Sequence, residues 1–411
     1  MPKPAKDRDI LRALASEVAE IAALPVQEER RRLWRALNAL RPERPMVTVY
    51  QAPWNEIGIA LECEDKECRD YEWQLRTTLY RCRHFDADYV TEPFIEVPKA
   101  VYSTGWGVEA DVEYMETDPE NVIRAQHYSN QFRTDADLDK IKSLTLTHDT
   151  SETARRQSVA SELFDGIIET RLAGYDPGYM SLWDPISMWM NVEDALFAII
   201  DRPEYVHEML ERMTRGYLSM LDQAETLDVL CETQQTTHWN HIGAQTDELP
   251  RPSYNPAHPR VRDLWCWGMA QMFSTVSPDI FAEFEVAYFK RLAERFGLVY
   301  YGCCEPLDDR IAQLRVIPNL RKISISPWAN QARAAAAIGG DYVFSRKPNP
   351  AMLAGDAFHE ERVRADLAET LRICREHDTP CELILKDVST IAYDPSRLDR
   401  WTRIAMELVA R

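Results

Sequence analysis

The chain has 411 residues, and its 67 acidic residues against 48 lysines and arginines give a formal net charge of −19. This charge argues against a groove for nucleic acid, whose phosphates require a basic surface. Hydrophobic residues make up 45% of the chain, which argues against wholesale disorder.

Neither a membrane span nor a secretory signal is visible. No apolar run reaches the roughly 18 residues that a span requires, and the first ten residues are charged rather than apolar. Nine cysteines, an odd number at scattered spacings, indicate reduced thiols. We therefore expect a cytoplasmic protein with no nucleic-acid partner and no membrane partner.

Residues 1–45 predict an N-terminal helical extension, and residues 46–411 predict the main domain. Leu11, Leu14 and Val18 fall at helical spacing, and so do Leu33 and Leu37 after a Leu-Pro break. We expect two amphipathic helices that pack on the main domain as a lid or as a dimerisation element, which is compatible with a homodimer.

From residue 46 the pattern changes to short β-rich runs followed by helical stretches. Strands are predicted at 46–50, 89–97 and 227–232, and helices at 191–200, 203–226 and 278–296. After residue 297 the alternation becomes regular. Strands at 298–303, 322–326, 342–345 and 381–385 are each followed by a helix, at 307–316, 329–338, 360–377 and 396–410.

This alternation of strand and helix is typical of parallel βαβ units. Four units in the last third, with comparable segments upstream, favour an α/β fold of the (β/α)8 TIM-barrel type with an N-terminal helical extension. No Gly-x-Gly-x-x-Gly motif follows any strand, so a dinucleotide-binding fold has little support.

Active sites of such barrels lie where the strands end, and this places polar and aromatic residues in candidate roles. Carboxylates at strand ends could transfer protons, and tryptophans could line a pocket for a flat or bulky ligand, although core packing is the better explanation of any single tryptophan. The candidates are Glu92, Asp184 and Glu232 for catalysis, and Trp54, Asn55, Trp183 and Trp328 for substrate binding.

The segment at 301–305, Tyr-Gly-Cys-Cys-Glu, is the strongest single signal. Alternation along a strand predicts that Tyr301, Cys303 and Glu305 share one side while Cys304 faces the other. Thiolate and carboxylate groups at a strand end suit zinc, with a histidine such as His238 or His241 added from another loop. The alternative is that the two cysteines are buried as small apolar side chains.

The segment at 345–350 places two cations, Arg346 and Lys347, at another strand end before a loop with two prolines. Such a pair suits recognition of a carboxylate or phosphate, and a solvated pair beside a helix is the alternative.

The blocks at 298–305, 318–328 and 341–348 resemble the uroporphyrinogen decarboxylase superfamily, most closely its branch of cobalamin- and corrinoid-dependent methyltransferases. The resemblance extends from about residue 44 onward and implies a (β/α)8 barrel with its pocket at the carboxyl ends of the strands. True decarboxylases have an arginine-rich opening segment, which is absent after Arg44, so porphyrinogen is not the expected substrate. The zinc methyltransferases carry His-x-Cys on a late strand, where this chain has Tyr301-Gly302-Cys303.

The resemblance implies a corrinoid-dependent methyltransferase or demethylase, assisted by zinc, that acts with a corrinoid-binding partner protein and a small-molecule methyl donor or acceptor. Zinc would be held by Cys303 with ligands from Glu305, His238 and Cys304, and Arg346 and Lys347 would anchor an anionic substrate. A metal-free decarboxylase or lyase acting on a small carboxylated compound is the alternative. A corrinoid carrier is disfavoured, because Asp-x-His occurs nowhere in the chain.

Overall fold

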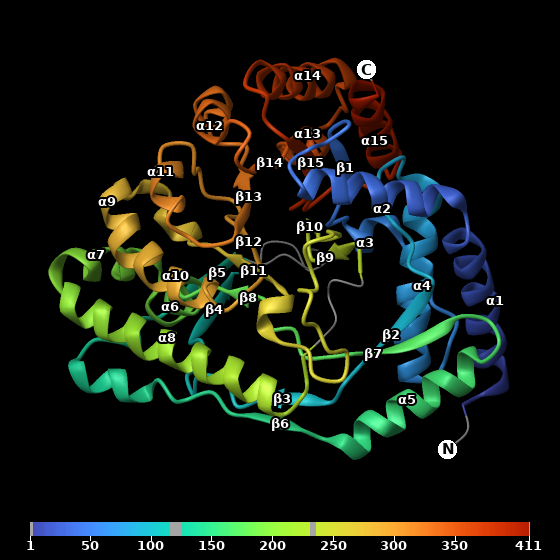
Figure 1. The fold of residues 1–411 in the computed structure, drawn as a ribbon, viewed down its shortest axis with the longest axis horizontal. Helices are drawn as coiled ribbons and strands as arrows, with labels where there is room; N and C mark the ends of the chain where they lie inside the picture. The colour runs from blue at the N-terminus through green and yellow to red at the C-terminus, as the bar shows by residue number, and fades with distance from the viewer. Residues whose placement is uncertain (1–2, 116–124, 231–235, 411) are drawn as a thin grey trace.

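The computed structural model describes residues 3–115, 125–230 and 236–410, which form a mixed α/β fold (Figure 1). Seven parallel strands make one sheet in the order β1-β15-β14-β13-β12-β11-β8. They are β1 Met46–Val49, β8 Tyr179–Met180, β11 Trp265–Gly268, β12 Leu298–Tyr301, β13 Leu320–Ile325, β14 Val343–Arg346 and β15 Cys381–Leu385.

This sheet pairs its last strand, β15, with its first, β1, in parallel register from Met46–Glu382 to Val49–Leu385. Joining the two ends of the main domain in this way is what a barrel-like arrangement requires. Among the described residues the sheet stays open between β1 and β8. The predicted α/β class with a parallel sheet is thus confirmed, while the closed (β/α)8 barrel stays a prediction.

Helices cover the outer face of the sheet, as the predicted βαβ units require. The helix predicted at 203–226 is α8, Pro203–Thr226, and it buries an apolar stripe that includes Met209, Met213 and Leu221. Other helices of the main domain are α3 Trp54–Ile57, α4 Lys66–His84, α5 Thr150–Phe164, α6 Trp183–Met190, α7 Val192–Asp201, α9 Pro278–Phe281, the π-helical turn η5 Ala282–Val286, α10 Ala287–Ala293, α11 Ile311–Leu314, α12 Gln331–Ile338, α13 Ala351–Ala354, α14 Glu360–Glu376 and α15 Ser396–Val409.

The upstream half departs from the regular pattern. The strand predicted at 89–97 begins only at residue 94, because side chains of α2, Pro25–Asn38, bind the preceding backbone. Arg30 donates to Tyr89 O, and Gln27 accepts from Thr91 N. Small sheets take the place of regular units. They pair β2 Phe94–Pro98 with β7 Glu169–Ala173, β3 Val101–Ser103 with β6 Leu146–His148, β4 Val112–Met115 with β5 Ala125–Tyr128, and β9 His238–Trp239 with β10 Ile242–Gly243.

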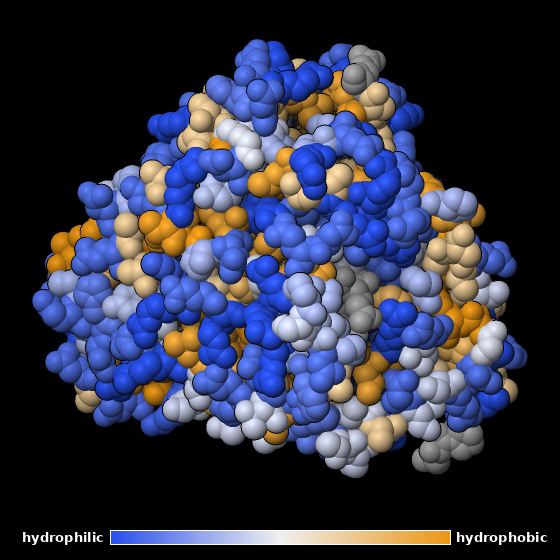
Figure 2. Space-filling view, viewed as in Figure 1, coloured by the Kyte–Doolittle hydropathy of each residue, from blue (hydrophilic) through white to orange (hydrophobic). Residues whose placement is uncertain are grey.

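The surface is mainly hydrophilic on the face that Figure 2 shows, with small apolar patches. One patch lies over α7, where Val192, Phe197 and Ile200 are exposed. No helix in the described part of the chain combines the length and apolar character that crossing a bilayer demands.

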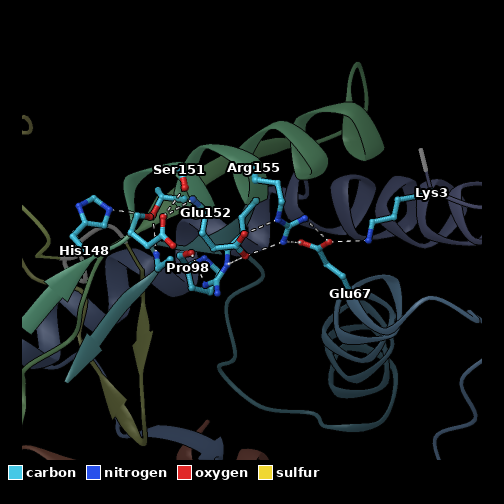
Figure 3. Close-up of polar contacts among 11 residues, drawn as sticks. Lys3, Glu67, Pro98, His148, Ser151, Glu152 and Arg155 are labelled. Atoms are coloured by element: carbon cyan, nitrogen blue, oxygen red, sulfur yellow. Dashed lines mark hydrogen bonds and ion pairs between the residues drawn. The ribbon is translucent and has the colours of Figure 1, made fainter. Parts of the chain in front are cut away.

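The two predicted N-terminal helices are confirmed as α1, Ala5–Ala22, and α2, Pro25–Asn38. A chain of ion pairs fastens the start of the chain to α4 and α5 (Figure 3). Glu67 accepts from Lys3 at 2.8 Å and from Arg155 at 3.1 Å, and Arg155 also contacts Glu152 at 2.7 Å. The extension is therefore held by many weak surface contacts as well as by its buried apolar stripe.

Candidate active site

Side chains from alternate strands meet on the inner face of the parallel sheet. Lys322 Nζ, from β13, lies 2.7 Å from Glu382 Oε2, from β15, and both side chains are fully buried. Tyr300 OH, from β12, donates to Ser345 Oγ, from β14, at 2.9 Å. Contacts between alternate strands are typical of the layers inside a curved parallel sheet. This face is therefore a polar interior rather than a purely apolar core.

A left-handed turn directly after β12 delivers Cys303 to this interior. Gly302 has φ +99°, and a Cβ on it would lie 2.5 Å from Leu307 Cδ1. Only glycine adopts this conformation without strain. The predicted alternation through Cys303 is wrong, because the strand ends at Tyr301, whose hydroxyl instead donates to Glu285 in the helix layer at 2.9 Å.

Cys303 and Lys386 form a close pair where β12 and β15 end. Lys386 Nζ donates to Cys303 Sγ at 2.7 Å, and both side chains are about nine-tenths buried or more. Cys304 Sγ lies 3.6 Å from Cys303 Sγ and 3.2 Å from Asp387 Oδ2. The hydrogen bond from Cys304 and the charge of Lys386 lower the pKa of Cys303 in spite of its burial. Burial alone would lower the pKa of Lys386, but the nearby negative charges, that of the Cys303 sulfur first, together have a larger effect, and the pKa of Lys386 is raised. Both shifts favour the charged form of the pair, a thiolate beside an ammonium.

Lys347 is a second buried cation on the same face. Its Nζ donates to Tyr300 OH and, at 2.7 Å, to Ser345 Oγ. Within the described residues it forms no ion pair with a carboxylate. Burial lowers the pKa of Lys347 to about 7, with a further contribution from the charge of Lys386.

His241 lies in the turn between β9 and β10 and is also buried. Its ring makes edge contacts with Trp267 at 4.5 Å and Tyr300 at 4.8 Å between ring centroids. Burial lowers the pKa of His241 well below its ordinary value, and the charges of Lys347 and Lys386 lower it further. The imidazole is therefore neutral, with one N–H donor and one acceptor nitrogen.

The side chains predicted as zinc ligands have other partners. Both oxygens of Glu305 accept backbone N–H groups, from Ala270 at 3.1 Å and Cys303 at 3.0 Å, and His238 Nε2 accepts from Val90 N at 2.9 Å. Over the described ranges, no three His, Cys, Asp or Glu side chains are grouped so that they could hold a metal ion. The residues present thus do not fit zinc in this arrangement. Zinc ligation stays a prediction.

Glu92 and Asp184, two of the predicted catalytic carboxylates, have partners other than Cys303. Glu92 Oε2 pairs with Arg31 at 3.0 Å beside a cavity of about 140 Å³ that Glu96 and His238 also line. Asp184, at the start of α6, accepts from Tyr179 OH, and burial raises the pKa of this carboxyl. Glu232 lies outside the described residues.

The predicted substrate-binding residues are likewise dispersed. Trp183 is buried and donates to Phe284 O at 3.1 Å, and Trp54 packs against Trp73, Tyr80 and Arg81. Asn55 is exposed, and so is Trp328, at 72%.

Arg346 and Lys347 are neighbours in sequence but serve different layers. Arg346 donates to Ser326 O at 2.7 Å and contacts Asp366 of α14, so it belongs to the helix side of the sheet. Of the two predicted anchors, only Lys347 therefore joins Cys303 on the inner face.

Three members of the interior group were not assigned these roles from the sequence. The sequence suggests His241 only as a ligand for zinc and Lys322 only as part of a strand, and it gives Lys386 no role. The available signal was a lysine inside or directly after an otherwise apolar strand, since a fully buried lysine requires a partner.

Comparisons with known proteins add little to this picture. No family model and no curated protein matches the chain. A solved structure described as a methyltransferase from Methanosarcina mazei is similar over 92% of this chain and 97% of its own, with 12% sequence identity and a TM-score of 0.49.

Proposed function

We propose that this chain is a methyltransferase or demethylase that moves a methyl group between a small organic substrate and a corrinoid carried by a partner protein. The observation that carries the proposal is the 2.7 Å contact between Lys386 Nζ and Cys303 Sγ. It lies where parallel strands end, the usual place for reacting groups in folds of this class. The resemblance of the blocks at 298–305, 318–328 and 341–348 supports the choice of methyl transfer.

The corrinoid would supply the atom that accepts or gives the methyl group. When a substrate loses its methyl group, the carbon–heteroatom bond breaks and its electron pair stays on the heteroatom, which must then gain a proton. Lys386 can donate that proton from its ammonium, and the Cys303 thiolate beside it holds the ammonium in place. In the opposite direction the same amine removes the proton from the heteroatom that receives the methyl group.

Two aromatic side chains support the approach of a flat partner group. Trp328, in the loop after β13, is 72% exposed, and Tyr393, in the loop after β15, is 67% exposed. Because the carboxyl ends of parallel strands lie at one edge of a sheet, both loops border the edge at which Cys303 and Lys386 lie. Exposed aromatic rings at such a rim suit contact with the face of a macrocycle.

The test uses the purified chain, free cob(I)alamin and one methyl donor at a time: 4-methoxybenzoate, trimethylamine or methanol. We expect at least one donor to yield methylcobalamin, detected by its absorption spectrum. Lys386→Met and Cys303→Ser should lower the rate by about 100-fold or more, the usual size of a lost proton-transfer group. Cys82→Ser is the matched control, because Cys82 lies on α4 and contacts Thr91 at 3.0 Å, away from the site. Failure of all three donors, or equal rates in all variants, overturns the proposal.

A metal-free decarboxylase or lyase is the second candidate, and Lys347 favours it. This buried ammonium binds only hydroxyl groups among the described residues, so it is suited to an anionic substrate. Incubation with a carboxyl-labelled aromatic acid distinguishes the two functions. Release of labelled carbon dioxide without any methylcobalamin would establish the second function and overturn the first.

A further inference from the structure

The interior lysines differ in how their charges are balanced. Lys322 is paired with Glu382 at 2.7 Å, and Lys386 with the sulfur of Cys303 at 2.7 Å and Asp387 at 3.4 Å. Lys347 donates to the hydroxyls of Tyr300 and Ser345 and forms no ion pair in the described part of the chain. Burying an ammonium without an anion costs free energy. Burial accordingly lowers the pKa of Lys347 to about 7, so the surrounding residues stabilise its charged form only weakly.

His241 is a second buried polar group on this inner face, and its hydrogen bonds are incomplete. Neither ring nitrogen has a hydrogen-bond partner among the described residues, although the side chain is only 3% exposed. Buried polar groups in native proteins are nearly always paired, and an orphaned one calls for a water, an ion or a ligand. Tyr300 joins the two groups, because its ring contacts His241 and its hydroxyl accepts from Lys347.

Contacts from several residues hold His241 at this position. Asn240, beside it in the turn, adopts φ +51°, in the left-handed region. The hairpin is fixed at Gly243, whose carbonyl accepts from Lys322 Nζ at 3.0 Å and from Asn38 Nδ2 at 2.8 Å. A Cβ on Gly243 would lie 2.3 Å from the ring of Trp34, so only glycine allows this close packing. These contacts fix the hairpin and therefore fix the position of the imidazole that it carries.

We propose that His241 and Lys347 together bind the carboxylate of a small, flat organic acid. The ammonium supplies the charge, and the neutral imidazole supplies an N–H donor to the same anion. Aromatic rings of Tyr50, Trp267 and Tyr300 surround His241 and suit a flat apolar body. The further idea, that this acid is the substrate and turns its other end toward Cys303 and Lys386, rests on the proposed function.

The experiment measures benzoate binding by calorimetry, with benzamide as the uncharged probe of equal shape. We expect benzoate to bind at least about tenfold more tightly than benzamide, because a hydrogen bond to a charged group contributes that much. Lys347→Met should remove this preference, and Lys347→Arg should restore part of it. Thermal unfolding of each variant shows whether it is folded.

His241→Phe separates a binding role from a packing role. If His241 binds the carboxylate, phenylalanine should weaken benzoate binding about threefold to tenfold while raising the melting temperature, since it removes an unpaired buried polar group. The matched control is His207→Phe on α8, where the imidazole contacts Tyr288 and Glu283. It should lower stability and leave benzoate binding unchanged.

Equal affinity of benzoate for the wild type and His241→Phe, or no preference over benzamide, would overturn the inference. The result is separable from the proposed function, because benzoate binding should persist in Cys303→Ser. A chain that binds benzoate through His241 and Lys347 but forms no methylcobalamin refutes the proposed function alone. Methyl transfer without benzoate binding refutes the carboxylate site alone.

Discussion

Replacing Lys386 with methionine should slow the alkylation of Cys303 at neutral pH. At a separation of 2.7 Å, two opposite unit charges interact by about 1.5 kcal/mol even in the dielectric of water, and by about 6 kcal/mol at the effective dielectric typical of proteins. Losing even the lower of these two energies reduces the thiolate fraction about tenfold at any pH at which most of the thiol is protonated. Because a more basic thiolate is about threefold more nucleophilic, the alkylation rate should fall at least about threefold.

The assay is alkylation by iodoacetamide followed by mass spectrometry of the peptide that contains residue 303. A Cys304→Ser background leaves Cys303 as the single thiol of the 301–305 segment and keeps a hydroxyl that can donate toward it. The pH at which the rate rises should be higher in Lys386→Met than in the background protein, because the ammonium lowers the pKa of Cys303. An identical rate and an identical pH dependence would show that the pair is not an ion pair, and the proposed proton transfer would lose its basis.

Three further predictions concern the surroundings of the pair. Lys322→Met should lower the free energy of unfolding, measured in urea, by about 3–5 kcal/mol, because it leaves the buried Glu382 without its cation. The double variant Lys322→Met/Glu382→Gln should recover part of this loss. An unchanged urea midpoint in Lys322→Met would contradict the prediction. Burial raises the pKa of Glu285 from 4.5 to about 8, so its stability contribution is fully present below pH 4.5 and is lost as the pH rises to 8. Glu285→Gln should flatten the decline between pH 5 and pH 8 in urea titrations, and equal declines would count against a buried neutral carboxyl. Gly302→Ala should cost about 1–3 kcal/mol, since φ is +99° and Leu307 lies 2.5 Å from the added Cβ; a variant as stable as the wild type, with Cys303 alkylated at the same rate, would refute the role of the turn.

The strands after residue 297 could be predicted because each belongs to a local unit. Strands β12 to β15 are short apolar runs with a helix after each, and strands buried on both faces give such continuous runs. The upstream strands were less predictable, since distant residues decide them. Gln27 and Arg30 bind the backbone at 89–91, and no pattern within residues 89–97 reveals this competition.

Two features of the site could have been predicted from the sequence but were not. Strand alternation through Ser345, Arg346 and Lys347 places the two cations on opposite faces, so they cannot form one anion clamp. Gly302 directly after an apolar strand signals a turn, after which alternation no longer applies. The predicted grouping of Tyr301, Cys303 and Glu305 extended the strand through that turn.

The position of His241 could not be predicted, because contacts from two remote segments hold it there. Trp34 and Asn38 on α2 and Lys322 on β13 all contact Gly243, two residues beyond the histidine. Sequence spacing indicates which residues share a face of one helix or strand. It does not indicate which loop is held in the interior by contacts with a distant helix or strand.

The distribution of charge connects these observations. The chain carries a formal charge of −19, yet Lys322, Lys347 and Lys386 are gathered on the inner face of the sheet. Glu382 is paired with the first and the Cys303 sulfur with the third, so among the described residues Lys347 is the one without an anionic partner, and His241 beside it has no hydrogen-bond partner. An anion is the ligand that lowers the energy of both groups at once, whereas a cation would meet repulsion from Lys347 and Lys386. If the neutral methanol and the cationic trimethylamine reacted faster than 4-methoxybenzoate, this charge argument would fail even if Cys303 proved essential.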